Sequence, residues 1–198
     1  AGAMIAVTGC AGNTASKQET TAAQTTAAET TAEETTAAGT TAEAKEGETT
    51  TFVDDLGREV ELELPITRAC VANRYNNELI RAVGAGDAVV GVDQYTSQDP
   101  VYWPQFGEDE TFGKDEYDYE KIVALDPQVL VVPKNGKVEE SVEKLESFGI
   151  KVVVITGWDN SDVPKQIRLC GELFGKQEQA EELVDVVNLC QLWRRELH

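Results

Sequence analysis

The hydrophobic positions divide the chain into a polar first quarter and a patterned remainder. From Ala11 to about Thr50 the sequence consists mainly of Thr, Ala, Glu and Gln, with almost no large apolar side chain. Beyond residue 51, short apolar runs alternate with segments whose apolar positions recur every three or four residues. The first part has too few apolar side chains to form a hydrophobic core and is predicted to be a disordered tether. The second part, about 150 residues long, is large enough for one domain with a hydrophobic core.

Four apolar runs in the patterned part are predicted to be strands. They lie at residues 69–72, 88–92, 129–132 and 151–155. They are continuously apolar and not alternating, which is typical of strands covered on both faces of a sheet. Ahead of them, Phe52-Val53 and residues 58–62 flank a turn that contains Gly57 and ends near Pro65, which predicts a β-hairpin.

Two helices are predicted between the first three runs. The first is capped by Asn76 or Asn77 and closed by Gly84. The second is capped by Asp118 and ends before Pro127. The connection between residues 94 and 117 shows no clear pattern of apolar positions. A loop of that length more often has a function than not.

Three further helices are predicted in the last third of the chain. One carries apolar residues on a single face and stops at Gly149. The next follows Ser161 or Asp162 and has Pro164 in its first turn. A last helix begins near Gln177. The residues expected to face inward in these helices are Val138, Val142, Leu145, Phe148, Ile167, Cys170, Leu173, Phe174, Ala180, Leu183, Val184 and Val187.

Strands that alternate with helices predict an α/β fold with a doubly wound, mostly parallel sheet. Ligands of such folds bind beyond the carboxyl ends of the strands. Side chains suited to ligand binding occur in the loops that follow the predicted strands: Arg74, Tyr75, Asn76, Tyr95, Tyr102, Trp103, Asn135 and Trp158. Two interpretations stay open for them. Arg74 holds an anionic group or makes a structural salt bridge, and the aromatic rings stack on a ligand or pack within their loops.

Charge and composition narrow the function. The chain has 17 basic and 36 acidic residues and a net charge of −19, which argues against nucleic-acid binding. Its one histidine, His198, argues against His-based zinc sites and Ser-His-Asp triads. Gly84-Ala85-Gly86 ends a helix, whereas a dinucleotide fingerprint begins one. We therefore expect no enzyme activity, no catalytic residue, no metal site and no cofactor. Cys70 and Cys170 are expected to be buried free thiols.

The sequence Val7-Thr8-Gly9-Cys10, behind a short apolar run, resembles the processing site of a bacterial lipoprotein. This resemblance implies that residues 1–10 are the remnant of a signal peptide. It also implies that Cys10 carries the lipid that holds the protein on the outer side of the cell membrane, with residues 11–50 as the tether.

Four segments together resemble one family. They are FVDDLGREV at 52–60, TRACVA at 67–72, AVGAGDAVVGV at 82–92 and DYEKIVALDP at 118–127. The family is that of the extracytoplasmic substrate-binding proteins of ABC importers for ferric siderophores, haem and cobalamin. The resemblance implies two α/β lobes joined by a rigid helix, with a metal chelate held between them and an ABC permease and its ATPase as partners. It implies an amino-terminal lobe at residues 51–175 and the start of the interlobe helix at 176–198.

The same resemblance implies roles for individual residues. Tyr95 corresponds to an aromatic residue of the cleft, Arg74 and Tyr75 to the first ligand-facing loop, and Glu120 to the acidic residue that docks on a permease arginine. The tail from Asn188 departs from the family pattern, which a shifted reading frame would explain, and the second lobe is expected to be missing. The alternative is a surface-anchored adhesion or signalling module that uses the same lobe to bind a protein.

Overall fold

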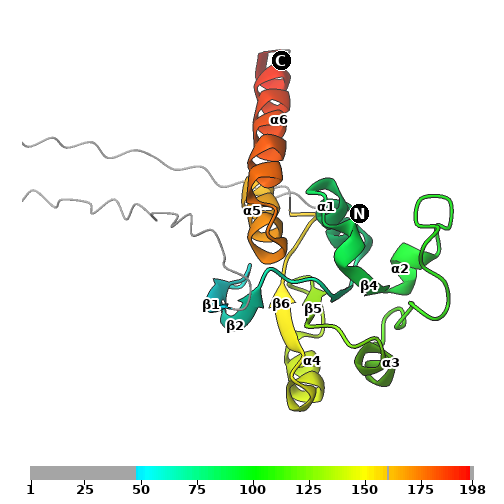
Figure 1. The fold of residues 1–198 in the computed structure, drawn as a ribbon. Helices are drawn as coiled ribbons and strands as arrows, with labels where there is room; N and C mark the ends of the chain where they lie inside the picture. The colour runs from blue at the N-terminus through cyan, green and yellow to red at the C-terminus, as the bar shows by residue number, and fades with distance from the viewer. Residues whose placement is uncertain (1–47, 160, 197–198) are drawn as a thin grey trace, which may run out of the picture. The chain divides into compact units, whose positions relative to one another are not determined.

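The computed structural model describes residues 48–159 and 161–196 (Figure 1). The predicted signal remnant, Cys10 and nearly all of the predicted tether lie outside this part of the chain. The elements in chain order are β1 (Glu48–Val53), β2 (Glu59–Leu64), β3 (Ala69–Val71), α1 (Arg74–Ala82), η1 (Gly86–Ala88), β4 (Val89–Val92), α2 (Gln94–Ser97), α3 (Tyr119–Ala124), β5 (Val129–Val132), α4 (Val138–Leu145), η2 (Glu146–Phe148), β6 (Lys151–Val154), α5 (Val163–Phe174) and α6 (Gln177–Glu196).

The predicted hairpin is confirmed as the antiparallel pair β1 and β2, in which Phe52 lies opposite Val60. Side chains of β2 alternate, so that Leu62 and Leu64 are buried while the intervening glutamates are exposed. This alternation is expected of strands with one covered face. β1 begins at Glu48, so the last residues assigned to the tether form part of the hairpin.

The four apolar runs form the predicted parallel sheet, in the order β4-β3-β5-β6. β3 comes first in the chain and lies inside the sheet, with β4 on one side and β5 on the other. The winding therefore reverses between β3 and β5. In doubly wound folds such a reversal opens a crevice at the carboxyl ends of the two strands.

Both faces of the sheet are covered, which explains the continuous apolar runs. Along β5, Val129 and Val131 join the core beneath α1, α5 and α6, whereas Leu130 and Val132 join a second core beneath α3 and α4. In Figure 1, α5 and α4 lie on opposite sides of the strands. Successive side chains of a strand point to opposite faces, so each strand needs apolar residues at every position.

The first helix begins earlier than the sequence predicted. Asn73 caps α1 and accepts a hydrogen bond from the Tyr75 backbone N–H at 2.9 Å, and Asn73 has a positive φ of 79°. Asn76 and Asn77 are buried inside the helix and do not cap it. Asparagine tolerates the left-handed region better than most residues, and this permits the sharp entry into α1.

The other helix ends agree more closely with those predicted from the sequence. Asp118 caps α3, and Asp162, the second of the two candidates, caps α5. Gly149 adopts the left-handed φ of 77° after η2. Phe148, however, is 62% exposed, although it was predicted to face inward. The chain tightens into a 3-10 turn after Leu145, so the spacing of an α-helix no longer applies there.

The last helix, α6, packs on α5 through its first half. Ala180 and Val184 are buried, and a Cβ on Gly171 of α5 would lie 2.5 Å from the Ala180 Cβ, so only glycine permits this approach. The helix continues past Asn188 through the atypical tail to Glu196, and its later turns project from the fold (Figure 1). Among the helices of the described part, none is long and apolar enough to cross a bilayer.

The cysteines of the described part are free, and their burial agrees with the sequence-based prediction. Cys70 and Cys170 are buried, and Cys190 is exposed. Burial raises the pKa of the Cys70 thiol to about 12, and it also raises the pKa of the Cys170 thiol. Both side chains therefore act as small apolar core residues.

Candidate functional site

The loops at the carboxyl ends of the four parallel strands are joined into one surface, called here the carboxyl edge. The Asn73 backbone N–H, after β3, donates to the carboxylate of Asp93, after β4, at 2.7 Å. The Lys134 N–H, after β5, donates to the Thr156 hydroxyl, after β6, at 3.2 Å. Hydrogen bonds between backbone and buried side chains thus fix neighbouring loops relative to one another.

Two aromatic side chains from different loops meet at this edge and are called the aromatic pair. The ring centroids of Tyr75, in the first turn of α1, and Trp158, after β6, are 6.3 Å apart with an interplanar angle of 62°. Tyr75 is 45% exposed. The Arg74 guanidinium carbon lies 5.4 Å from the centre of the Tyr75 ring. The edge-to-face arrangement is a favourable one for two rings, and with Tyr75 exposed and Trp158 half-buried it presents an apolar surface to solvent.

The aromatic pair depends on a close backbone approach. The Gly157 N–H donates to the Asn76 side-chain oxygen at 2.7 Å. A Cβ placed on Gly157 would lie 2.7 Å from the Tyr75 carbonyl oxygen. Only glycine lets the loop after β6 come this near to the start of α1, so Gly157 sets the separation of the two rings.

A buried carboxylate fixes the loops after β3 and β4. Besides the Asn73 N–H, Asp93 accepts hydrogen bonds from the Thr96 N–H at 3.1 Å and the Thr96 hydroxyl at 2.9 Å. Asn77 in turn donates to the Thr96 hydroxyl at 3.0 Å. Burial raises the pKa of Asp93, against the opposing effect of these hydrogen bonds. The network holds Asn73 in its strained conformation with positive φ. It thereby sets the direction in which α1 leaves the loop.

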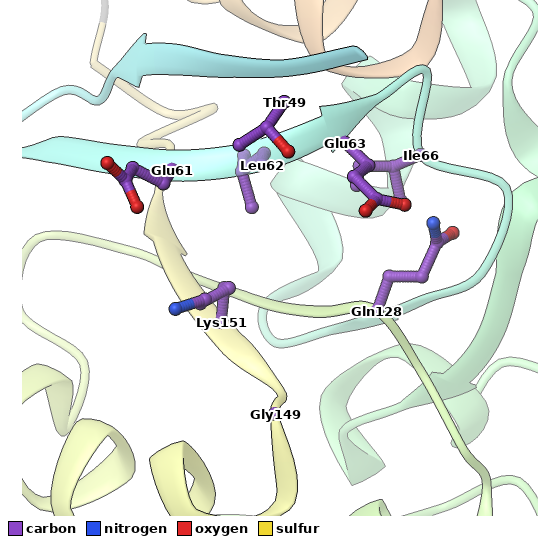
Figure 2. A pocket seen from close by; sticks show the side chains of 8 residues that line it. All are labelled: Thr49, Glu61, Leu62, Glu63, Ile66, Gln128, Gly149 and Lys151. Carbon is purple, nitrogen blue, oxygen red and sulfur yellow. The ribbon is translucent and has the colours of Figure 1, made fainter. Parts of the chain in front are cut away.

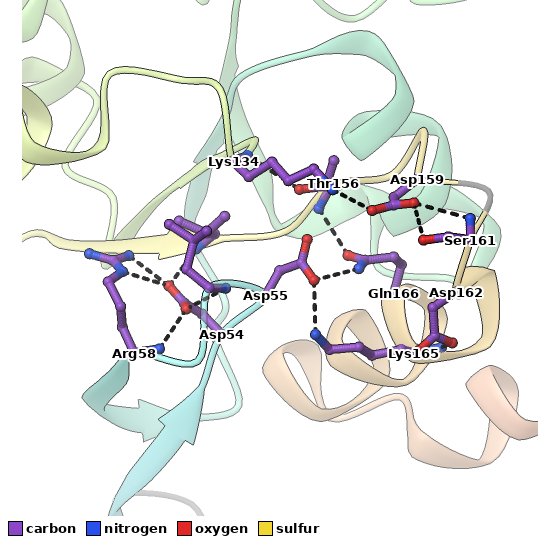
Figure 3. A network of polar contacts seen from close by, with 12 residues as sticks. Asp54, Asp55, Arg58, Lys134, Thr156, Asp159, Ser161, Asp162, Lys165 and Gln166 are labelled. Atoms are coloured by element: carbon purple, nitrogen blue, oxygen red, sulfur yellow. Dashed lines mark hydrogen bonds and ion pairs between the residues drawn. The ribbon is translucent and has the colours of Figure 1, made fainter.

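A second polar network supports the end of β6 (Figure 3). Asp54, in the hairpin turn, is fully buried and receives the Arg58 guanidinium through Nη2 at 2.7 Å and Nε at 3.0 Å. It also accepts the backbone N–H groups of Leu56 and Arg58, each at 3.0 Å, and that of Val154 at 3.1 Å. The turn of the hairpin is therefore tied to the last residue of β6.

Asp55 extends this network to the loop after β6. Its carboxylate accepts from the Lys165 ammonium at 2.9 Å and from the Gln166 amide at 2.8 Å, and the Gln166 oxygen accepts the Thr156 N–H at 2.9 Å. Burial alone would raise the pKa of Asp55, but hydrogen bonds from Lys165 and Gln166 hold it below its usual value. Asp55 thus stays ionised and anchors the start of α5.

An ion pair crosses the carboxyl edge between the loops after β5 and β6. Lys134 pairs with Asp159, which also accepts the Ser161 backbone N–H at 3.0 Å (Figure 3). The hydrogen bond to Asp159 raises the pKa of Lys134, and the pKa of Asp159 lies well below its usual range for the same reason. The predicted residue Asn135 follows on the same loop and is exposed.

Two other predicted ligand residues have defined internal contacts. The Asn76 side chain is buried, where it accepts from Gly157 and donates to the Ala72 carbonyl at 3.1 Å. Asn76 therefore supports the site from the protein interior. Tyr95 is partly exposed in α2, which follows β4, where its hydroxyl donates to Asp115 at 2.7 Å and the Lys114 ammonium lies 5.1 Å from the ring centre.

Tyr102 and Trp103 do not lie at the carboxyl edge. Both rings pack on the guanidinium of Arg81 in the last turn of α1, at 4.8 Å and 5.2 Å from its central carbon. Trp103 is only 2% exposed and packs against Phe106. Seven residues of helix separate Arg81 from Arg74, which is about 10 Å along the axis. The prediction assigned these rings to a ligand-facing loop, but the segment turns back over the far end of α1.

The sequence-based prediction placed four residues that shape the site in the loops after the strands but gave them no role in binding: Asp93, Lys134, Gly157 and Asp159. Lys134 and Asp159 lie in loops that were recognised, but nothing in the sequence indicates that they pair. Asp93 does carry a signal, since an acidic residue directly after a buried strand is a good helix cap. The close approach at Gly157 depends on two segments far apart in the sequence and has no local signal.

Two depressions flank these networks. A shallow groove of about 270 Å³ runs beside Tyr75, between α1, α5 and α6. Another, of about 330 Å³, lies between the hairpin and the amino ends of β5 and β6 (Figure 2). The second is at the wrong edge of a parallel sheet for a ligand site. Over residues 48–159 and 161–196 there is no cluster of three side chains suited to hold a metal ion.

Comparison with known proteins identifies the family. A family model described as periplasmic binding protein matches residues 70–188, which is more than half of the chain. The chain belongs to the periplasmic binding protein family. Membership implies an extracytoplasmic location, as the sequence predicted. A search of curated proteins found no match to this periplasmic binding protein.

Solved structures agree with the fold. A periplasmic solute-binding protein of Veillonella parvula has a TM-score of 0.66 and 20% identity, over 75% of this chain and 48% of its own. A periplasmic haem-binding protein of Pseudomonas aeruginosa has a TM-score of 0.55 and 22% identity, over 67% and 46%. The petrobactin-binding protein of Bacillus subtilis has a TM-score of 0.56 and 18% identity, over 71% and 50%. This periplasmic binding protein therefore spans about half the length of the structures it resembles.

Proposed function

We propose that the protein captures a metal chelate outside the cytoplasm and delivers it to an ABC importer. The observation that carries the proposal is the aromatic pair at the carboxyl edge, formed by the exposed Tyr75 and the half-buried Trp158, where folds of this class bind their ligands. Of the similar structures, one is named for haem and another for petrobactin. Both names denote chelates or chelators with extended apolar or aromatic parts, for which such a pair is suited.

Binding would use the aromatic pair for contact area and the neighbouring polar side chains for orientation. Arg74, the first residue of α1, lies over the Tyr75 ring, and Asn135 and Tyr95 are exposed on the segments that follow β5 and β4. The hydrogen bonds that join these loops keep the surface fixed before a ligand arrives, which lowers the entropic cost of binding. No covalent step is required of any residue.

Tryptophan fluorescence tests this function directly. Titration with haem, ferric siderophores or cobalamin is expected to quench emission with a dissociation constant of about 1 μM or below. The quenching should fall in Trp158→Phe, because that ring belongs to the aromatic pair. Trp193→Phe is the matched control, since Trp193 is exposed on the projecting part of α6. Absence of quenching by all of these compounds, with capture of a host or cell-wall protein instead, would support the adhesion or signalling alternative.

We infer that Cys10 is the site of lipid attachment, on the strength of its position after Val7-Thr8-Gly9. Fused to a bacterial lipoprotein leader ahead of Val7, the protein is expected to incorporate labelled palmitate and to fractionate with membranes. Cys10→Ala should abolish both results, and equal labelling of the variant would contradict the assignment.

We further propose that Glu120 docks on the permease. It is exposed in the first turn of α3. In a complete protein assayed with its permease and ATPase, Glu120→Arg is expected to reduce uptake at least tenfold and to leave chelate affinity unchanged, because charge reversal turns attraction into repulsion. Glu139→Arg, an equally exposed change in the first turn of α4, is the control. Unchanged uptake with Glu120→Arg would remove the docking role.

A further inference from the structure

An apolar groove opens beside the aromatic pair and follows α1 toward its last residue. Tyr75, Glu78, Leu79 and Ala82 line one side of the groove, and their spacing places them on a single face of the helix. Gly157, in the loop after β6, lines the end nearest the carboxyl edge. Tyr75 thus belongs both to the aromatic pair and to the groove, so a ligand that rests on the pair has the groove within reach.

The other walls of the groove are apolar side chains of α5 and α6, spaced four residues apart on each helix. They are Val163 and Ile167 of α5 and Leu183 and Val187 of α6. Ile167 is buried, whereas the other three stay half-buried although they pack against the main core. Among the described residues that line the groove, only Glu78 is charged, and it is paired with Arg74 at 3.4 Å. The groove therefore suits an uncharged apolar group.

The dimensions of the groove match a single hydrocarbon chain. Tyr75 and Ala82 are seven residues apart on α1, which is about 10 Å along the helix axis. A volume of about 270 Å³ over a length of about 10 Å leaves a cross-section of about 27 Å². Carbon atoms in contact are about 4 Å apart, so one file of methylene groups needs less than about 20 Å². An α-helix with its side chains is about 10 Å across, which is roughly three times too large in area.

We propose that the protein binds an amphiphilic chelate, whose alkyl chain lies in this groove while its metal-binding part rests on the aromatic pair. The inference rests on the function proposed above and names the class of its substrate. A bound chain would remove water from Leu79, Val163, Leu183 and Val187, which are otherwise left half-buried. A fully buried methylene group contributes about fourfold in affinity, so one that is covered on one side by an open groove should contribute about twofold.

The test uses the ferric complexes of one linear trihydroxamate chelator whose terminal amine carries an acetyl, butanoyl, hexanoyl, octanoyl or dodecanoyl group. Tryptophan quenching measures the affinity of the wild type for each probe, at concentrations below those at which the longer chains aggregate. Affinity is expected to rise about twofold per methylene group as far as octanoyl. Dodecanoyl should add nothing more, because about 10 Å of groove is the extended length of about eight carbon atoms.

The variant Ala82→Phe tests where the chain lies. Ala82 is exposed as the last residue of α1, and the added ring would point back along the helix into the far half of the groove. Affinity in this variant should stop rising at butanoyl. Ala124→Phe is the matched control and should keep the wild-type rise, because Ala124 is exposed as the last residue of α3 and does not line the groove. Each series is compared with the acetyl probe on the same variant, so a general loss of stability cannot imitate the result.

The outcomes separate this inference from the function on which it rests. Acetyl and octanoyl probes that bind equally tightly, or a rise with chain length that Ala82→Phe leaves intact, overturn the groove assignment and leave chelate capture standing. Binding of none of the probes, nor of haem or cobalamin, overturns both. Sedimentation of the ligand-free wild type as a dimer that Ala82→Phe abolishes would place a second copy of the chain in the groove and overturn the proposal.

Discussion

Replacement of Asp54 by alanine is expected to lower the free energy of unfolding by about 3 kcal/mol. The carboxylate is fully buried and accepts hydrogen bonds from the Arg58 guanidinium and from three backbone N–H groups. Alanine would leave those groups without their acceptor. Arg58 is partly exposed and can recover some hydration, which places the cost at the low end of the range for broken buried pairs.

Thermal and urea unfolding followed by circular dichroism measures this loss, which corresponds to a fall in melting temperature of about 10 °C for a domain of this size. Asp54→Asn keeps the shape but presents an NH₂ group to donors, so most of the loss should persist. Asp109→Ala is the control, because Asp109 is exposed in the loop after β4. A stability for Asp54→Ala within about 0.5 kcal/mol of that control would show that the network does not support the fold.

The sequence predicted the architecture because the signals for it are local. A run such as 129–132 is apolar at every position only if both faces are covered, and the two cores on either side of β5 bear this out. A helix cap such as Asp118 is signalled locally, because the residue type itself favours that position. The start of α1 was misplaced because Asn73 takes a left-handed conformation that depends on Asp93, twenty residues further on.

The candidate site could be predicted only in outline. The loops that form the carboxyl edge follow from the order of strands and helices, which is how the sequence places Arg74, Tyr75 and Trp158 at this edge. Which of the aromatic rings meet is decided by tertiary contacts. Trp103, like Trp158, lies in a segment that follows a strand, but its segment turns back on Arg81, and no local pattern signals this. The pairing of Lys134 with Asp159 is likewise set by the alignment of β5 with β6.

Gly157→Ala is expected to reduce chelate affinity tenfold or more, although residue 157 itself need not touch the ligand. The added Cβ would lie 2.7 Å from the Tyr75 carbonyl oxygen and 2.8 Å from its carbon, and a backbone neighbour cannot move aside as a flexible side chain can. The loop after β6 would have to withdraw from α1. Trp158 moves with it, so the aromatic pair separates and the hydrogen bond from residue 157 to Asn76 lengthens.

The measurement is a titration of Gly157→Ala and Gly86→Ala with whichever chelate quenches the wild type. Gly86 is the matched control, because a Cβ there would meet only Arg81 at an ordinary 3.7 Å. Gly157→Ala should also lose about 1 to 3 kcal/mol of stability from overpacking, so both variants are compared well below their melting temperatures. Since the substitution removes no polar group, the weakening should be similar for charged and neutral chelates. If Gly157→Ala binds as tightly as Gly86→Ala, the spacing of Tyr75 and Trp158 does not govern capture, and the aromatic pair is not the ligand surface.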